Sequence, residues 1–105
     1  MDRRIETRVV EGTGVGLTTL IQRDACDVWW ITVSPKTVGS VTDVEIYDGF
    51  DRGGNQKWHA HPAYTRQHNF IPPIPCDQAL TVYCGGDTKC YTIGYSVRKW
   101  RKEVA

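Results

Sequence analysis

Two histidines separated by one residue, His59 and His61, are the most distinctive candidates for chemistry in this sequence. In a β-strand, residues two apart point to the same side, so both imidazoles can reach one metal ion. A third ligand would have to come from His68, Asp48 or a cysteine, and none of these is an obvious choice. A solvated strand face carrying two histidines explains the same pattern. We therefore expect no metal or other cofactor, with His59 and His61 as weak candidates.

Four carboxylates lie close together in the sequence at Asp43, Glu45, Asp48 and Asp51. Paired carboxylates serve acid–base catalysis or calcium binding. Here Asp43 and Glu45 fall on the outer face of a predicted strand, and the other two are residues that favour turns. A hydrolase also needs a pocket, and no segment of this chain is suited to build a deep one. We expect a structural role for these acids and no enzymatic activity.

The sequence contains four cysteines, Cys26, Cys76, Cys84 and Cys90. An even number in a small domain is typical of a disulfide framework. The first residues lack the apolar segment of a secretory signal, however, and cytosolic thiols stay reduced. No pair has the C-x-x-C spacing of a zinc ribbon. A cysteine–histidine nucleophile is open in principle, but free cysteines are more often buried in a core. The sequence leaves open whether these thiols are free or bridged.

The elements that must position these residues are predicted to be strands. The 105 residues include ten glycines, five prolines, five tyrosines and four tryptophans, a composition that favours β-structure with many turns. The segment 28–33, VWWITV, is the strongest strand, and 39–54 reads as a strand that leads into a tight turn. Further strands are expected at 17–22, 56–61, 66–71, 79–84 and 91–97.

Strict alternation along 28–33 places Trp29 with Ile31 on one face and Trp30 with Val28 on the other. Both faces of this strand are bulky, so we expect it to be covered on both sides, or covered on one side and used for contact on the other. The prolines of 72–75 predict a stiff crossing without ladder hydrogen bonds, because proline lacks an N–H donor.

The last two strands are predicted to form a hairpin through residues 85–89. Matching their apolar faces pairs Val82 with Ile93. This register disfavours a direct bridge between Cys84 and Cys90, unless a bulge brings the two residues together.

These segments predict an all-β fold, an antiparallel β-sandwich or jelly-roll-like domain of about seven to eight short strands with little or no helix. Residues 1–11 form an N-terminal arm or edge strand, 12–97 the single sandwich domain, and 98–105 a basic C-terminal tail. A net charge of +1 and the lack of a long apolar run argue against nucleic-acid and membrane partners.

Aromatic residues are the best candidates for a binding surface. Trp30, Trp58, Trp100, Tyr47 and Tyr64 could form a platform that binds sugars or single-stranded nucleic acid, or the centre of a protein interface. Because the net charge is close to zero, a protein partner is favoured over a sugar, and a sugar over nucleic acid.

Four segments carry a recurring set of strand ends and turns: GSVTDVEIYDG with a following Asp and Gly over 39–53, the proline segment 72–75, ALTVYCGG over 79–86, and YTIGY over 91–95. Together they resemble small β-sandwich structural proteins of tailed bacteriophages, of the capsid decoration or cement kind. The resemblance covers about Trp30 to Val97, and its motifs specify structure rather than a catalytic site.

The resemblance implies a virion protein, made in the host cytoplasm, that binds the assembled capsid shell and stabilises it. A head-fibre or tail component and a carbohydrate-binding sandwich module are the alternatives. The implied partner is the major capsid protein or another virion protein, and the implied state is a homo-oligomer, with a trimer favoured. The charged termini and the tryptophans supply the predicted partner-binding residues, which are Arg3, Arg4, Trp30, Trp58, Trp100 and Arg101.

Overall fold

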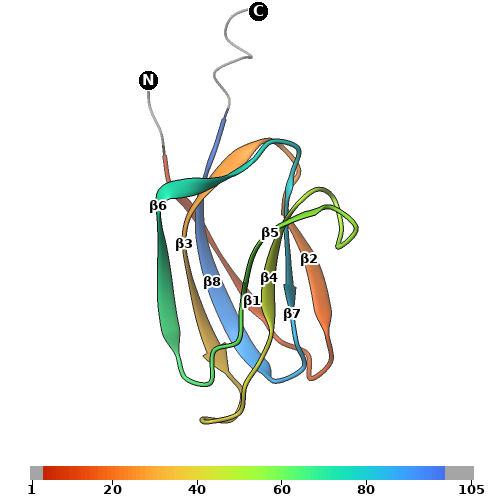
Figure 1. The fold of residues 1–105 in the computed structure, drawn as a ribbon, viewed down its shortest axis with the longest axis vertical. Helices are drawn as coiled ribbons and strands as arrows, with labels where there is room; N and C mark the ends of the chain where they lie inside the picture. The colour runs from red at the N-terminus through yellow and green to blue at the C-terminus, as the bar shows by residue number, and fades with distance from the viewer. Residues whose placement is uncertain (1–3, 99–105) are drawn as a thin grey trace, which may run out of the picture.

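The computed structural model describes residues 4–98, which form two four-stranded sheets packed face to face (Figure 1). Sheet A has the order β1 (Glu6–Glu11), β8 (Thr88–Val97), β3 (Cys26–Pro35) and β6 (Arg66–Cys76). Sheet B has the order β2 (Leu17–Gln22), β7 (Leu80–Cys84), β4 (Val44–Asp48) and β5 (Asn55–Ala60).

All pairings within the two sheets are antiparallel. Apart from β4 and β5, strands that follow each other in the chain lie in opposite sheets, as in a jelly roll. The predicted all-β fold is confirmed. Along the described part of the chain, no helix is present that could cross a membrane.

The core lies between the two sheets and consists of residues that alternate along the four central strands. Sheet A contributes Val28, Ile31, Val33, Tyr91 and Ile93, none of them more than 1% exposed. Sheet B contributes Val44, Ile46, Leu80, Val82 and Cys84, all at 0%. These strands have a neighbour on each side, so their inward side chains are shielded from water in every direction.

A β-bulge in β3 changes the faces predicted for residues 28–33. Val28 pairs with Tyr95 of β8 and Trp30 pairs with the next residue, Gly94, which makes Trp29 an extra residue in β3. The pairing of β3 with β6 breaks at the same place, but there the extra residues belong to β6. Val28 and Ile31 are therefore both buried in the core, whereas the two tryptophans are only partly buried. The prediction of strict alternation is wrong here, because one inserted residue inverts the side-chain direction along the rest of a strand.

The last two strands do not form the predicted hairpin. β7 pairs with β2 and β4, and β8 pairs with β1 and β3, so the connection between them passes from sheet B to sheet A. Val82 and Ile93 both reach the core, but from opposite sides. A short loop between two apolar strands fits a hairpin and a crossing between sheets equally well, and only the packing of the whole chain distinguishes them.

The proline-rich segment leaves the ladder only in part. Pro72 and Pro73 lie in a break of the register and have no partner in β3, as predicted. Ile74 and Pro75 of β6 stand opposite Val28 and Asp27 of β3. Pairing is tolerated here because β6 is an edge strand, where the missing N–H of a proline can face away from the ladder.

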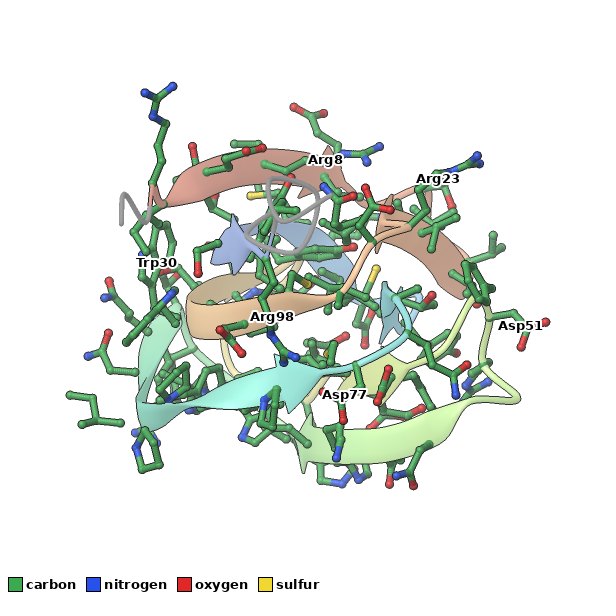
Figure 2. The ribbon with its side chains drawn as sticks, turned by 90° about the horizontal axis from the view of Figure 1, so that it is seen from above. Arg8, Arg23, Trp30, Asp51, Asp77 and Arg98 are labelled. Carbon is green, nitrogen blue, oxygen red and sulfur yellow. The ribbon has the colours of Figure 1, made fainter. Side chains whose placement is uncertain are left out.

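Arg98 fastens the end of the sandwich at which β8 ends (Figure 2). Its backbone N–H donates to the carbonyl of Ala25, and its guanidinium donates to Asp27 and to Asp77, each at 2.9 Å. Although burial opposes its charge, the two carboxylates raise the pKa of Arg98. The predicted basic tail of 98–105 therefore begins with an anchored residue, and its other positions lie outside the described residues.

Replacing Leu80 by alanine should lower the free energy of unfolding by about 2–5 kcal/mol, because this fully buried side chain would leave a cavity between the sheets. Leu20→Ala is the matched control, since Leu20 of β2, which stands opposite Thr81 of β7, is only partly buried. It should cost roughly 1 kcal/mol or less. Urea unfolding, monitored by tryptophan fluorescence, gives the free energy of unfolding of both variants. Equal losses of this free energy would contradict the inward orientation of Leu80.

Asp48, at the end of β4, accepts hydrogen bonds from the backbone N–H of Gln78 at 2.8 Å and of Ala79 at 3.4 Å. Burial alone would raise the pKa of Asp48, but these donors outweigh burial and lower the pKa below its ordinary 3.8. A carboxyl group with a lowered folded-state pKa stabilises the fold above its unfolded pKa. That stability is lost as the pH falls through the folded-state value.

Asp48→Asn is therefore expected to cost about 1 kcal/mol of unfolding free energy at neutral pH. The difference from the wild type should narrow below about pH 4, where the wild-type carboxyl also becomes neutral. Urea unfolding at several pH values gives this comparison. A difference that stays constant across the whole range would show that the charge of Asp48 does not matter.

Candidate functional site

The outer face of sheet A carries no charged side chain across its centre, although 24% of the chain is Asp, Glu, Lys or Arg. Within the described residues, the register and the alternation of the strands give its uncharged members, which are Thr7 and Val9 of β1, Cys90, Thr92, Gly94 and Ser96 of β8, Trp30 and Thr32 of β3, and Gln67, Asn69 and Ile71 of β6. Two acids bound this surface at its ends: Glu11 stands opposite Cys90, and Asp27 stands opposite Ser96 and is paired with Arg98. We call this surface the uncharged face.

Trp30 occupies an inner strand of this face, and Figure 2 shows it on the outside of the sandwich. It stands opposite Gly94 on one side and Asn69 on the other. The indole covers Gly94 so closely that a Cβ atom there would lie 2.3 Å from Nε1. The indole N–H of Trp29 donates to Ser96 at 3.0 Å. Both rings are therefore held in place before any partner arrives, which reduces the entropy lost on binding.

Two exposed aliphatic side chains extend the uncharged face toward its edges. Val9 of β1 is 61% exposed, and Ile71 of β6 is 89% exposed. Both strands are edges of sheet A, so their outer backbone N–H and C=O groups are also open to a partner. An extended surface that has no charge at its centre, contains fixed indoles and has acids only at its ends is typical of a protein interface with a polar rim.

The outer face of sheet B is polar and is organised around the buried carboxylate of Glu45, which is 6% exposed. Arg52, from the β4–β5 loop, donates from Nε to Oε1 at 3.1 Å and from Nη2 to Oε2 at 3.3 Å. The hydroxyl of Tyr47 donates to the same carboxylate. The guanidinium also lies 3.6 Å from the ring centroid of Tyr83. The loop thus folds back over the sheet and neutralises Glu45.

Next to this carboxylate, two histidines meet two acids across the β4–β5 ladder. Glu45 stands opposite His59, and continuing the register places Asp43 opposite His61. Nε2 of His59 is 3.7 Å from Oε2 of Glu45, and Nδ1 of His61 is 2.5 Å from Oδ1 of Asp43. The two imidazole centroids are 4.3 Å apart. The side chains of Asp43, His59 and His61 form what we call the histidine–acid cluster.

The third partners predicted for the two histidines are wrong. His68 packs edge-on against Trp58, with centroids 4.9 Å apart, and its burial, together with nearby Arg66, lowers its pKa. Asp48 holds the chain before β7 instead, and Cys26, Cys76 and Cys84 are buried. Asp43 takes the place beside the histidines because β4 pairs with β5, which the sequence does not reveal.

The predicted partner-binding residues fall into three groups. Trp30 lies on the uncharged face, and Arg4 is exposed just before β1. Trp58 packs against the core, with its ring centroid 5.3 Å from that of Phe70. The remaining positions, Arg3, Trp100 and Arg101, lie outside the described residues. Sequence reasoning missed Val9 and Ile71, whose only signal was an apolar residue at an edge-strand position.

No family model and no curated protein matches this sequence. Among solved structures, the chain is similar to the core of Drosophila NLP, described for its pentamer formation and histone binding. The identity is 13% and the TM-score 0.55, with 90% of this chain and 99% of that chain covered. At this identity the similarity concerns the fold alone.

Two further structures align less closely. A subunit of Bacillus endospore appendages, described as disulfide-linked pili, has 14% identity and a TM-score of 0.47 over 92% of each chain. VP2 of infectious bursal disease virus, from a subviral particle, has 12% identity and a TM-score of 0.37 over 90% of this chain and 32% of that one. These scores are too low to support an argument about this protein.

The four cysteines are free and differ in their surroundings. Cys26 and Cys76 stand opposite each other in the β3–β6 ladder and are fully buried. Their mutual hydrogen bond and their burial raise the pKa of the Cys26 thiol, and burial raises that of Cys84. Cys90 belongs to the uncharged face and is partly exposed.

Because the thiolate is the reactive form, a native-state assay with Ellman's reagent should detect one thiol, that of Cys90. Denaturant should release all four. The Cys90→Ser variant should lose the native signal while keeping three thiols in denaturant. Fast native reaction in that variant would contradict the buried placement of the other cysteines, and fewer than three thiols in non-reducing denaturant would show that a disulfide had formed.

Proposed function

We propose that this chain is a structural, non-enzymatic protein that docks through its uncharged face onto protein subunits of a larger assembly. The observation that carries the proposal is the absence of charge across the centre of a four-stranded face that also holds two fixed indoles. Removing such a surface from water is favourable, whereas a charged surface would need a matching partner for each charge. The jelly-roll core supports the face as a rigid sheet.

The finer assignment within this proposal is a capsid decoration protein of a tailed phage, acting in the virion as a homo-oligomer, with a trimer favoured. Its support is the resemblance of the motifs between Trp30 and Val97. The partner would be the major capsid protein or another virion protein. A folded domain that binds only the assembled shell stabilises that shell by mass action, without any chemical step.

A sugar-binding module is the second candidate, and one arrangement favours it. Trp30 lies directly beside Asn69, and Gln67 donates to Asn69 at 2.9 Å. An indole next to side-chain amides can stack on a sugar ring while the amides bond to its hydroxyl groups. This candidate uses the same face, so it must be separated from the first by experiment.

Placing one charge on the uncharged face tests the proposal. Thr92→Lys puts an ammonium group opposite Thr32 in the middle of sheet A. We expect at least a tenfold loss of binding, since a buried unpaired charge costs more than about 1.4 kcal/mol. Thr18→Lys is the matched control, because Thr18 is exposed on sheet B. It should bind as the wild type does.

The measurements are light scattering for the oligomeric state, co-sedimentation with tailed-phage capsids that lack the protein, and a glycan array. Capsid binding that Thr92→Lys abolishes and Thr18→Lys preserves would support the decoration assignment. Binding to isolated tails or fibres would support a structural role in the virion, but as a tail or head-fibre component instead of a capsid decoration protein. If the protein is a monomer that binds glycans but neither capsids nor tails, the result would favour the sugar-binding module and overturn the structural role.

A further inference from the structure

We propose that the histidine–acid cluster on sheet B is a binding site for a divalent transition-metal ion, with zinc as the best fit. Asp43, His59 and His61 each offer one ligand atom, and these atoms lie within 4.8 Å of one another. The site lies on the opposite sheet from the uncharged face, so the inference is independent of the proposed function.

The β4–β5 ladder brings the three side chains together. His59 and His61 are two residues apart on β5 and therefore share one side of the sheet. Asp43 precedes β4 and faces His61 across the ladder. Residues directly opposite each other in an antiparallel pair have Cβ atoms about 4.5–5.5 Å apart, which is close enough for both side chains to bind one ion.

The donor set suits zinc. Two imidazole nitrogens and one carboxylate oxygen are common zinc ligands, and three protein ligands leave a position for water. Around a zinc ion with bonds of about 2.0–2.1 Å, neighbouring ligand atoms are roughly 3.3 Å apart. The side chains of His61 and Asp43 are 56% and 49% exposed, and that of His59 is 37% exposed, so small rotations can bring the three atoms to this spacing.

Glu45 is a positioning residue in this arrangement. Its carboxylate is already held by Arg52 and Tyr47, and it lies 3.7 Å from Nε2 of His59. A metal-bound histidine commonly has a carboxylate beside its other ring nitrogen, which fixes the orientation of the ring. The buried network under the cluster therefore fixes a carboxylate close to Nε2 of His59, where a small rotation of the ring would let Nε2–H donate to it while Nδ1 binds the ion.

An ion bound here would join β5 to β4. β5 is an edge strand that pairs only with β4, so its attachment depends on a single ladder. An ion that binds only the folded protein stabilises it in proportion to the logarithm of its concentration. At a hundredfold excess over the dissociation constant, we expect the melting temperature to rise by roughly 10 °C.

Zinc titration of the full chain by calorimetry tests the site. The experiment uses the Cys90→Ser background, because a partly exposed thiol could bind zinc independently. We expect one zinc ion per chain and no binding of calcium, which prefers oxygen ligands. His61→Ala and Asp43→Asn should each weaken zinc binding at least tenfold, and Glu45→Gln should weaken it about 10–100-fold. Asp51→Asn is the matched control for the acid and should change nothing.

Proton NMR of the histidine rings locates the ion. Zinc should shift the ring signals of His59 and His61 and leave those of His68 in place, since His68 packs against Trp58 away from the cluster. The two cluster side chains that are replaced, His61 and Asp43, are 56% and 49% exposed, so those variants should fold normally. Absence of zinc binding at millimolar concentration would overturn the proposal, and so would binding that survives in the His61→Ala variant.

Discussion

The bulge at Trp29 is the constraint on which the two surfaces of sheet A depend. It lets Val28 and Ile31 both enter the core although they are three residues apart in a strand. Without the extra residue, either one of these aliphatic side chains would face water or a tryptophan would have to fit between the sheets. The bulge therefore completes the core and, by the same displacement, places Trp29 and Trp30 on the outside.

The outer faces of the two sheets differ in chemistry because different interactions hold their side chains in place. On sheet A, Trp30 covers Gly94 and Trp29 bonds to Ser96, so the centre of the face is ordered by its indoles, and the ion pair of Asp27 with Arg98 lies at its end. On sheet B, Arg52 reaches back from a loop to neutralise a buried carboxylate, and histidines and acids gather beside it. A sandwich keeps these surfaces on opposite sides, so a protein partner on one leaves the other accessible.

Much of the fold could be predicted from local patterns, whereas pairings between strands could not. The segment 17–22 was predicted as a strand from its apolar residues and coincides with β2 (Leu17–Gln22). The expected hairpin between the last two strands was wrong because a sandwich offers each apolar strand two possible sheets. The loss of pairing was predicted correctly for Pro72 and Pro73 but not for Pro75, because a proline can pair in an edge strand, and which strand lies at an edge is a property of the assembled sheet.

The sequence by itself determined the strands, the turns, and the shared face of His59 and His61, because side-chain alternation depends only on neighbouring residues. It also determined that aromatic residues would be available for contact. The tertiary structure decided which face each tryptophan occupies and which acid stands beside the histidines. Those outcomes depend on a bulge and on the order of strands in each sheet. The bulge and the strand order form because apolar residues that are distant in the chain are buried against one another. A local sequence pattern cannot predict which distant residues will meet.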